Sequence, residues 1–177
     1  MLLPYACVTA LVFLSIIFSG ISLFTYGWAT IRPFNPLYPL IDDDEILLGL
    51  VPFDPDTPFG WLVATCIFMY LNFACSILTF LFCVIGAIIF ILRGDSRYQK
   101  YIYVILCGST FLTGLFGAVA FVIFVASYHE ELENYFYGDV SIGYSPFLDL
   151  IGFVIAVLAT GVSAFFAIAL LNPNDEN

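Results

Sequence analysis

Charged side chains are scarce in this 177-residue sequence: they make up 10% of it, against about 25% in an average soluble protein. Only four are basic, and with 14 acidic residues the formal net charge is −10. A water-soluble globule needs more polar surface than this, and a strongly acidic chain repels the phosphates of nucleic acid. The sequence therefore excludes a soluble domain and a nucleic-acid-binding protein.

Residues that carry catalytic chemistry are also scarce. His129 is the only histidine, so a His pair or a multi-His metal site has too few members. The acidic run 42–45 lacks the alternation and the glycine of an EF-hand loop, and we interpret it as a solvated turn. We expect no charged residue at bilayer depth, which counts against a proton-coupled pump. We predict a protein that is not an enzyme, with no cofactor and no metal site.

Long apolar runs are present instead. No Asp, Glu, Lys or Arg occurs in residues 1–31, 57–92, 101–129 or 150–174. Each run exceeds the roughly 20 residues that an α-helix needs to cross a bilayer. The sequence predicts one all-α transmembrane domain, residues 1–177, with spans near 6–26, 61–92, 101–127 and 147–171.

The loop between the second and third spans, residues 93–100, contains three of the four basic residues. Basic loops face the cytosol, so we expect both termini in the cytosol and loops 27–60 and 128–146 outside. The plasma membrane is the expected location.

The two outer loops contain short extended stretches. Residues 28–31, 46–51 and 139–144 have strand-like composition, whereas six of the nine prolines interrupt loop 27–60 and disfavour a sheet through all of it. We expect a small sheet from both loops. The acidic segment 129–135 is expected to prolong the third helix, and Ser145-Pro146 to begin the fourth.

This layout resembles the claudin-like superfamily, which includes claudins, peripheral myelin proteins, clarins and channel γ subunits. The resemblance rests on four spans, a long first outer loop, and three residues of the loop-one signature: Trp28, Gly49 and Leu50. Val51 replaces the second Trp of that signature, and its two disulfide-forming cysteines are missing. The resemblance implies a left-handed four-helix bundle with a small extracellular antiparallel sheet.

Small and polar residues inside the predicted spans are candidates for packing or for binding a partner chain. Small side chains let membrane helices approach closely, and a stripe of them on the fourth span faces either the bundle or a partner. Asn72 is the most polar residue inside a span and bonds another helix or has a function. The stripe and its candidate counterpart on the third span are Gly152, Ala156, Ala159, Ser163 and Ala167, with Gly114, Gly117 and Ala118.

The first function hypothesis is lateral binding to another membrane protein, as an auxiliary or assembly subunit of a channel or receptor. Cell–cell adhesion or junction organisation is the first alternative, and a small transporter or lipid-handling protein is the second. The partners are then the lipid bilayer and either another membrane protein or a second copy. Aromatic residues dominate binding hot spots. We therefore expect the contacts of the outer loop to be its hydrophobic residues Phe34, Leu37, Tyr38, Phe53 and Phe59.

Overall fold

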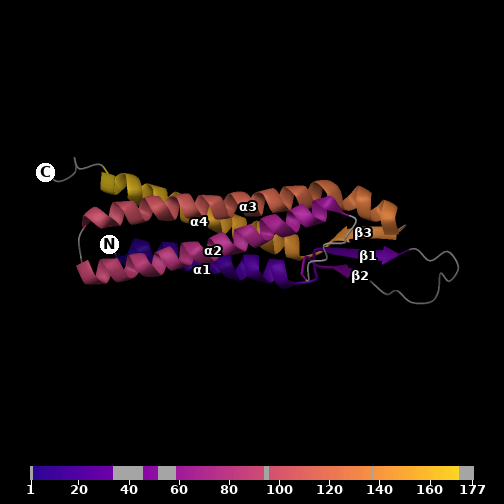
Figure 1. Ribbon diagram of the computed structural model, residues 1–177, viewed down its shortest axis with the longest axis horizontal. Helices are drawn as coiled ribbons and strands as arrows, with labels where there is room; N and C mark the ends of the chain where they lie inside the picture. The colour runs from indigo at the N-terminus through magenta and orange to yellow at the C-terminus, as the bar shows by residue number, and fades with distance from the viewer. Residues whose placement is uncertain (1, 34–45, 52–58, 94–95, 137, 172–177) are drawn as a thin grey trace.

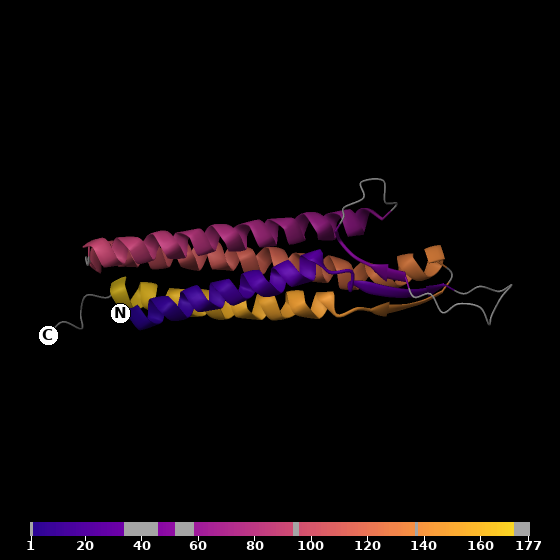
Figure 2. The same cartoon turned by 90° about the horizontal axis from the view of Figure 1, so that it is seen from below.

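Four long helices run side by side along the length of the molecule (Figures 1 and 2). The computed structural model describes residues 2–33, 46–51, 59–93, 96–136 and 138–171. Within these residues, four helices are long and apolar enough to cross a membrane, which confirms the predicted all-α transmembrane fold. The helices are α1 (Leu2–Phe24), α2 (Gly60–Arg93), α3 (Ser96–Phe136) and α4 (Ser145–Leu171).

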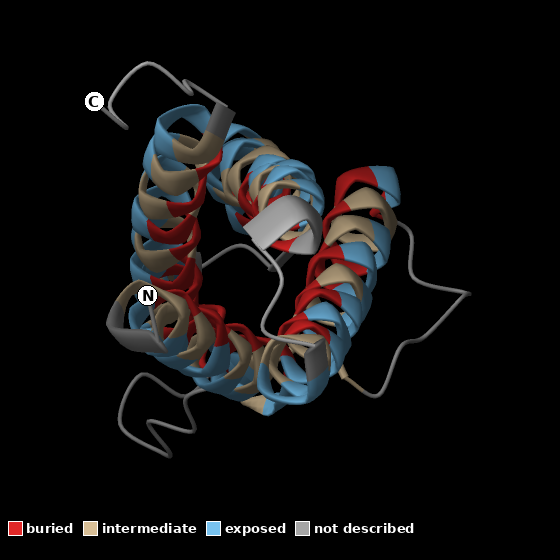
Figure 3. Ribbon diagram, turned by 90° about the vertical axis from the view of Figure 1, so that its left-hand side faces the viewer, coloured by how far each residue is buried: buried red, intermediate tan, exposed pale blue. Residues whose placement is uncertain are grey.

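The helices form a ring in which α1 packs against α2 and α4, and α3 also packs against α2 and α4. Figure 3 shows this ring from one end: buried residues line the inside, and exposed residues cover the outside. The exposed residues are mostly Leu, Ile, Val and Phe. This surface suits a hydrocarbon solvent, and helices satisfy their own backbone hydrogen bonds there.

The helix ends follow local sequence signals. The acidic segment 129–135 continues α3 to Phe136, and Ser145 begins α4 with Pro146 in its first turn, where the missing proline N–H costs nothing. The third helix therefore reaches well past the predicted span end at residue 127. Figure 1 shows its outer end beside the strands.

Three short strands form an antiparallel sheet at the outer end of the bundle: β1 (Ala29–Pro33), β2 (Ile46–Leu48) and β3 (Gly138–Ile142). Their order is β2-β1-β3, and Thr30 lies opposite Leu47 on one side and Ser141 on the other. The predicted sheet from two outer loops is thus confirmed. Ala29 and Ile31 are buried, as expected when one face of a sheet packs on the core.

The interior contains two hydrophobic clusters. The outer cluster includes Trp28, Phe124 and Leu132 and lies between the sheet and the outer parts of the helices. The inner cluster includes Val8 and Leu106 and lies toward the loop between α2 and α3. Hydroxyl-bearing side chains are buried in the same bundle, among them Ser15, Ser76, Thr79, Thr110 and Thr113.

Candidate functional site

Trp28, the first residue of the claudin-like signature, joins α1, the sheet and α3. Its side chain is fully buried. The indole Nε1 donates a hydrogen bond to the Ser22 carbonyl oxygen (2.7 Å), and the ring meets Phe124 edge-on with centroids 4.9 Å apart. The backbone N–H of Trp28 donates to the Leu48 carbonyl (2.9 Å). Trp28 therefore holds the sheet on the bundle and is not available to a partner.

Gly49 and Leu50, the other two signature residues, are also internal. A Cβ on Gly49 would lie 2.8 Å from Cδ1 and 3.1 Å from Cα of Tyr26, so a larger residue would push against backbone. Leu50 is buried, and its carbonyl oxygen accepts a hydrogen bond from Cys66 Sγ (3.3 Å). The signature residues thus position the outer cluster.

A close backbone approach joins the end of α1 to the start of α4. Gly143 N donates to the Trp28 carbonyl (3.0 Å), and Ser145 N donates to the Gly27 carbonyl (2.8 Å). A Cβ on Gly143 would lie 2.0 Å from the Gly27 oxygen, so only glycine fits here. Ser22 Oγ donates to the Ser145 carbonyl (2.8 Å). The sequence analysis did not predict this junction. Its only signal in the sequence is one glycine in each of the two segments that meet, Gly27 and Gly143.

Of the five expected outer-loop contacts, the structure describes only Phe59. Phe34, Leu37, Tyr38 and Phe53 lie outside the described residues. The prediction for Phe59 was wrong, because its ring is buried between Trp61 and Tyr135 with centroids 5.9 and 5.1 Å away. Burial of this ring removes apolar surface from water. The exposed apolar side chains of the described sheet are instead Ile46 and Leu47, at 43% and 53% exposed.

The small-residue stripe of α4 faces the interior. All five of its members are buried. Gly152 faces α1: a Cβ there would lie 3.5 Å from the Phe18 Cβ and 3.6 Å from the Ser19 nitrogen. On α3, a Cβ on Gly114 would lie 3.7 Å from the Ala156 Cβ. The stripe brings α4 close to both neighbours, so in this structure its surface is already occupied.

Asn72 bonds another helix through Asp149, an acidic residue at the start of the predicted fourth span. Its Nδ2 donates to Oδ1 of Asp149 (3.3 Å), and both side chains are buried. We expected no charged residue at bilayer depth, but Asp149, four residues into α4, is buried inside the bundle and belongs to the candidate span Ser145–Leu170. It lies one turn after Ser145 and three residues before Gly152, so helical periodicity turns it inward.

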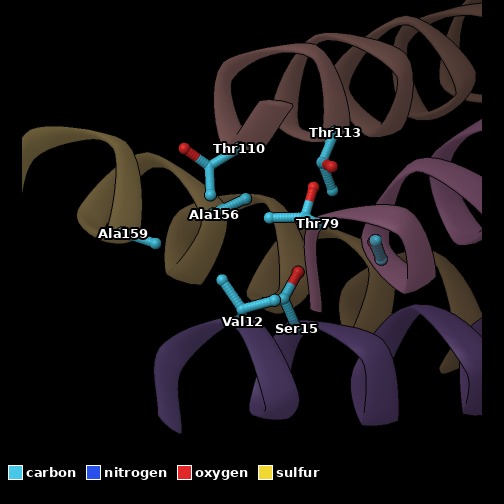
Figure 4. Close-up of a pocket in the computed structure, with 8 residues that line it drawn as sticks. Val12, Ser15, Thr79, Thr110, Thr113, Ala156 and Ala159 are labelled. Atoms are coloured by element: carbon cyan, nitrogen blue, oxygen red, sulfur yellow. The ribbon is translucent and has the colours of Figure 1, made fainter. Parts of the chain in front are cut away.

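A small polar cavity lies deeper in the bundle, between all four helices. The volume of the cavity is about 10 Å³, which is roughly the space that one water molecule needs. Figure 4 shows Ser15 of α1, Thr79 of α2 and Thr113 of α3 pointing toward one another.

The hydroxyls around this cavity have already donated their hydrogens. Thr79 Oγ1 donates to the Cys75 carbonyl (2.8 Å), Thr113 Oγ1 to the Ser109 carbonyl (3.0 Å) and Ser76 Oγ to the Asn72 carbonyl (2.9 Å). Their lone pairs are left for a ligand, and a hydrogen-bond donor such as water has the right chemistry.

Outside the bundle, His129 lies on the exposed part of α3. Its Nδ1 is 3.1 Å from Oε2 of Glu133, one turn away, and both side chains are more than half exposed. Such an exposed pair on one helix contributes little to stability. It is a surface feature of the acidic end of α3.

Four candidate spans, a three-stranded sheet at one end of the bundle and a buried aromatic cluster beneath it define a membrane protein with a small sheet as its cap. A family model described as "Tight junction protein, Claudin-like" matches residues 1–170. The chain therefore belongs to the claudin-like family, as its resemblance indicated. No curated protein matches the sequence.

Proposed function

We propose that this claudin-like membrane protein binds laterally to another membrane protein, as an auxiliary or assembly subunit of a channel or receptor. The observation that carries this proposal is the edge of the sheet. Among the described residues, no strand pairs with the outer side of β2, and Ile46 and Leu47 expose apolar surface there. Unlike the apolar helix faces, which lie in lipid, this surface lies in water, so covering it is favourable.

The interior of the bundle supports the same proposal. The buried polar side chains of the spans face one another, and the small-residue stripe of α4 is occupied by α1 and α3. The outer helix faces are then uniformly apolar and suit lipid or the apolar helices of a partner. We also propose the plasma membrane as the location, with both termini in the cytosol, because loop 93–100 contains most of the basic residues.

A photo-crosslinking amino acid at position 47 tests the proposal in intact cells. If the sheet edge contacts a partner subunit, light yields one discrete heteromeric adduct, identified by mass spectrometry. The matched control carries the same amino acid at position 168, where Ile168 is at least as exposed as Leu47 but lies near the other end of α4. Identical adducts from both positions, or none from position 47, would contradict lateral binding through the sheet.

Cell–cell adhesion is the second candidate, because the matching family is described as one of tight junction proteins. Adhesion needs outer loops of opposing cells to meet. Residues 32–56 and 130–149 are strongly acidic, so direct self-association across membranes is opposed at low salt. Expression in non-adherent cells separates the two: aggregation of expressing cells with one another, strengthened by salt, supports adhesion, whereas dispersed cells with the position-47 adduct support the auxiliary role.

A further inference from the structure

The carboxyl group of Asp149 is placed where an aspartate ion is unstable. The side chain has no exposed surface. Oδ1 accepts one long hydrogen bond from Asn72 Nδ2 (3.3 Å), and Oδ2 has no hydrogen-bond partner among the described residues. A buried ionised carboxylate with so little solvation costs several kcal/mol.

The pair is nevertheless closely fitted into the bundle. A Cβ on Gly117 of α3 would lie 3.0 Å from Asn72 Nδ2 and 3.4 Å from Asp149 Oδ1, so glycine makes room for the two polar groups. Ser76 Oγ bonds the Asn72 carbonyl (2.9 Å) one turn further in. Helices α2, α3 and α4 therefore all contribute to one site around the carboxyl group.

The described groups that contact the carboxyl group of Asp149 are neutral. The group facing it from α2 is the neutral amide of Asn72, and from α3 it is the backbone at Gly117. The buried polar residues of α1 toward this end are the hydroxyls of Ser15, Ser19 and Ser22. The sequence places no Lys or Arg in residues 1–31, 57–92, 101–129 or 150–174. A proton is the simplest ligand that removes the charge.

We propose that the Asp149–Asn72 pair is a proton-binding site, in which Asp149 is a neutral carboxylic acid at pH 7. The proton removes the cost of the buried charge, while Oδ1 still accepts the hydrogen bond from Asn72. Assembly of α2, α3 and α4 around the pair then takes up one proton from water. Above the pH at which a water-exposed aspartate ionises, the native state binds more protons than the unfolded state, so stability falls as pH rises.

Infrared spectroscopy of the full chain at pH 7, in a detergent that contains no ester or carboxyl group, tests the proposal. A neutral carboxylic acid has a C=O stretch above the amide I band, where a carboxylate does not absorb. We expect one such band in the wild type and its loss in Asp149→Asn. The control Asp139→Asn removes an exposed carboxylate of β3 and is expected to leave the band unchanged.

A swap variant shows whether the site, rather than the position, holds the proton. Asn72→Asp combined with Asp149→Asn places the acid on α2 and the amide on α4, and we expect the band to return. Thermal unfolding supplies a second readout: the melting temperature of the wild type falls more steeply from pH 5 to 8 than that of Asp149→Asn.

Two results would overturn the proposal. If the wild type shows no acid band, Asp149 is ionised. A melting temperature that then rises with added Na⁺ would assign the site to a bound cation. A band that persists in Asp149→Asn would belong to another carboxyl group. The absence of the band in the wild type overturns the proposal even if a variant fails to fold.

Discussion

The outer end of the molecule and the middle of its bundle are packed by different means. The outer cluster contains large side chains, with Trp28, Phe124 and Trp61 in edge-on contact. The middle of the bundle contains Gly, Ala, Ser and Thr, as at Gly152 and Thr79. One chain thus has an aromatic interior at one end and a small, hydroxyl-bearing interior further in.

The surrounding solvent explains this difference. The outer end lies in water, where burying apolar surface is favourable at about 25 cal/mol per Å². Lipid is as apolar as leucine, so helices inside the bilayer gain from close approach and from hydrogen bonds instead. We therefore expect single substitutions to cost most at the outer end and least among the hydroxyls of the bundle.

Trp28→Ala is expected to have the largest effect. It removes a fully buried ring and its hydrogen bond to Ser22, which corresponds to a loss of about 3–5 kcal/mol. Thermal unfolding of the purified protein measures it, because the chain has two tryptophans and Trp61 still reports from the outer cluster. The control Phe147→Ala removes an exposed ring at the outer end of α4, and an equal loss there would contradict the comparison.

Gly143→Ala tests the same end through the backbone. The added Cβ would lie 2.0 Å from the Gly27 oxygen, so β3 and α1 must separate and two backbone hydrogen bonds weaken. We expect a loss of about 1–3 kcal/mol. In Gly161→Ala the new Cβ meets open space, and the helix gains up to about 1 kcal/mol. If the two variants unfold at the same temperature, the close approach does not exist in solution.

Much of the fold was predictable because charge placement alone marks the spans. The charge-free runs gave all four helices, and the strand-like stretches of the outer loops gave the sheet. The acidic segment 129–135 was expected to prolong the third helix, and it is helical, although the span rule alone ends at the first charges. A helix outside the bilayer is stabilised by packing, here of Leu132 against the outer cluster, which a hydropathy pattern does not contain.

The polar site was not predicted, although its signal was present. Asp149 follows an acidic loop, and the sequence analysis did not consider it as a partner for Asn72. Asp149 lies three residues before Gly152, on the same helical face as the small-residue stripe. On α2, Asn72 precedes Ser76 and Thr79 at helical spacing. Extending each stripe by one turn brings the acid and the amide to the same side of their helices. That they meet depends on how α2 and α4 are shifted along each other, which one sequence does not specify.

Thr160→Val is expected to have a small effect. The Thr160 hydroxyl donates to Thr110 Oγ1 across the α3–α4 interface (2.9 Å), and such bonds in membranes average about 0.6 kcal/mol. A double-mutant cycle with Thr110→Val isolates this coupling in the melting curves. The control Thr65→Val loses a bond to its own helix, at the Trp61 carbonyl (2.9 Å), and no interhelical coupling with Thr110 is expected. A coupling above about 2 kcal/mol would make the bundle as dependent on specific contacts as the outer cluster.

Ser163→Ala is expected to have the smallest effect, and its sign is the informative part. Ser163 is fully buried in the stripe of α4, and its Oγ has no partner among the described residues. An unsatisfied buried hydroxyl is destabilising, so its removal is expected to raise stability by up to about 1 kcal/mol. Ser76→Ala, at a hydroxyl that bonds the Asn72 carbonyl and lines the cavity, is expected to lower it. A loss in both variants would mean that Ser163 has a partner in the membrane, and the interior of α4 would then depend on specific contacts, as the outer cluster does at Trp28.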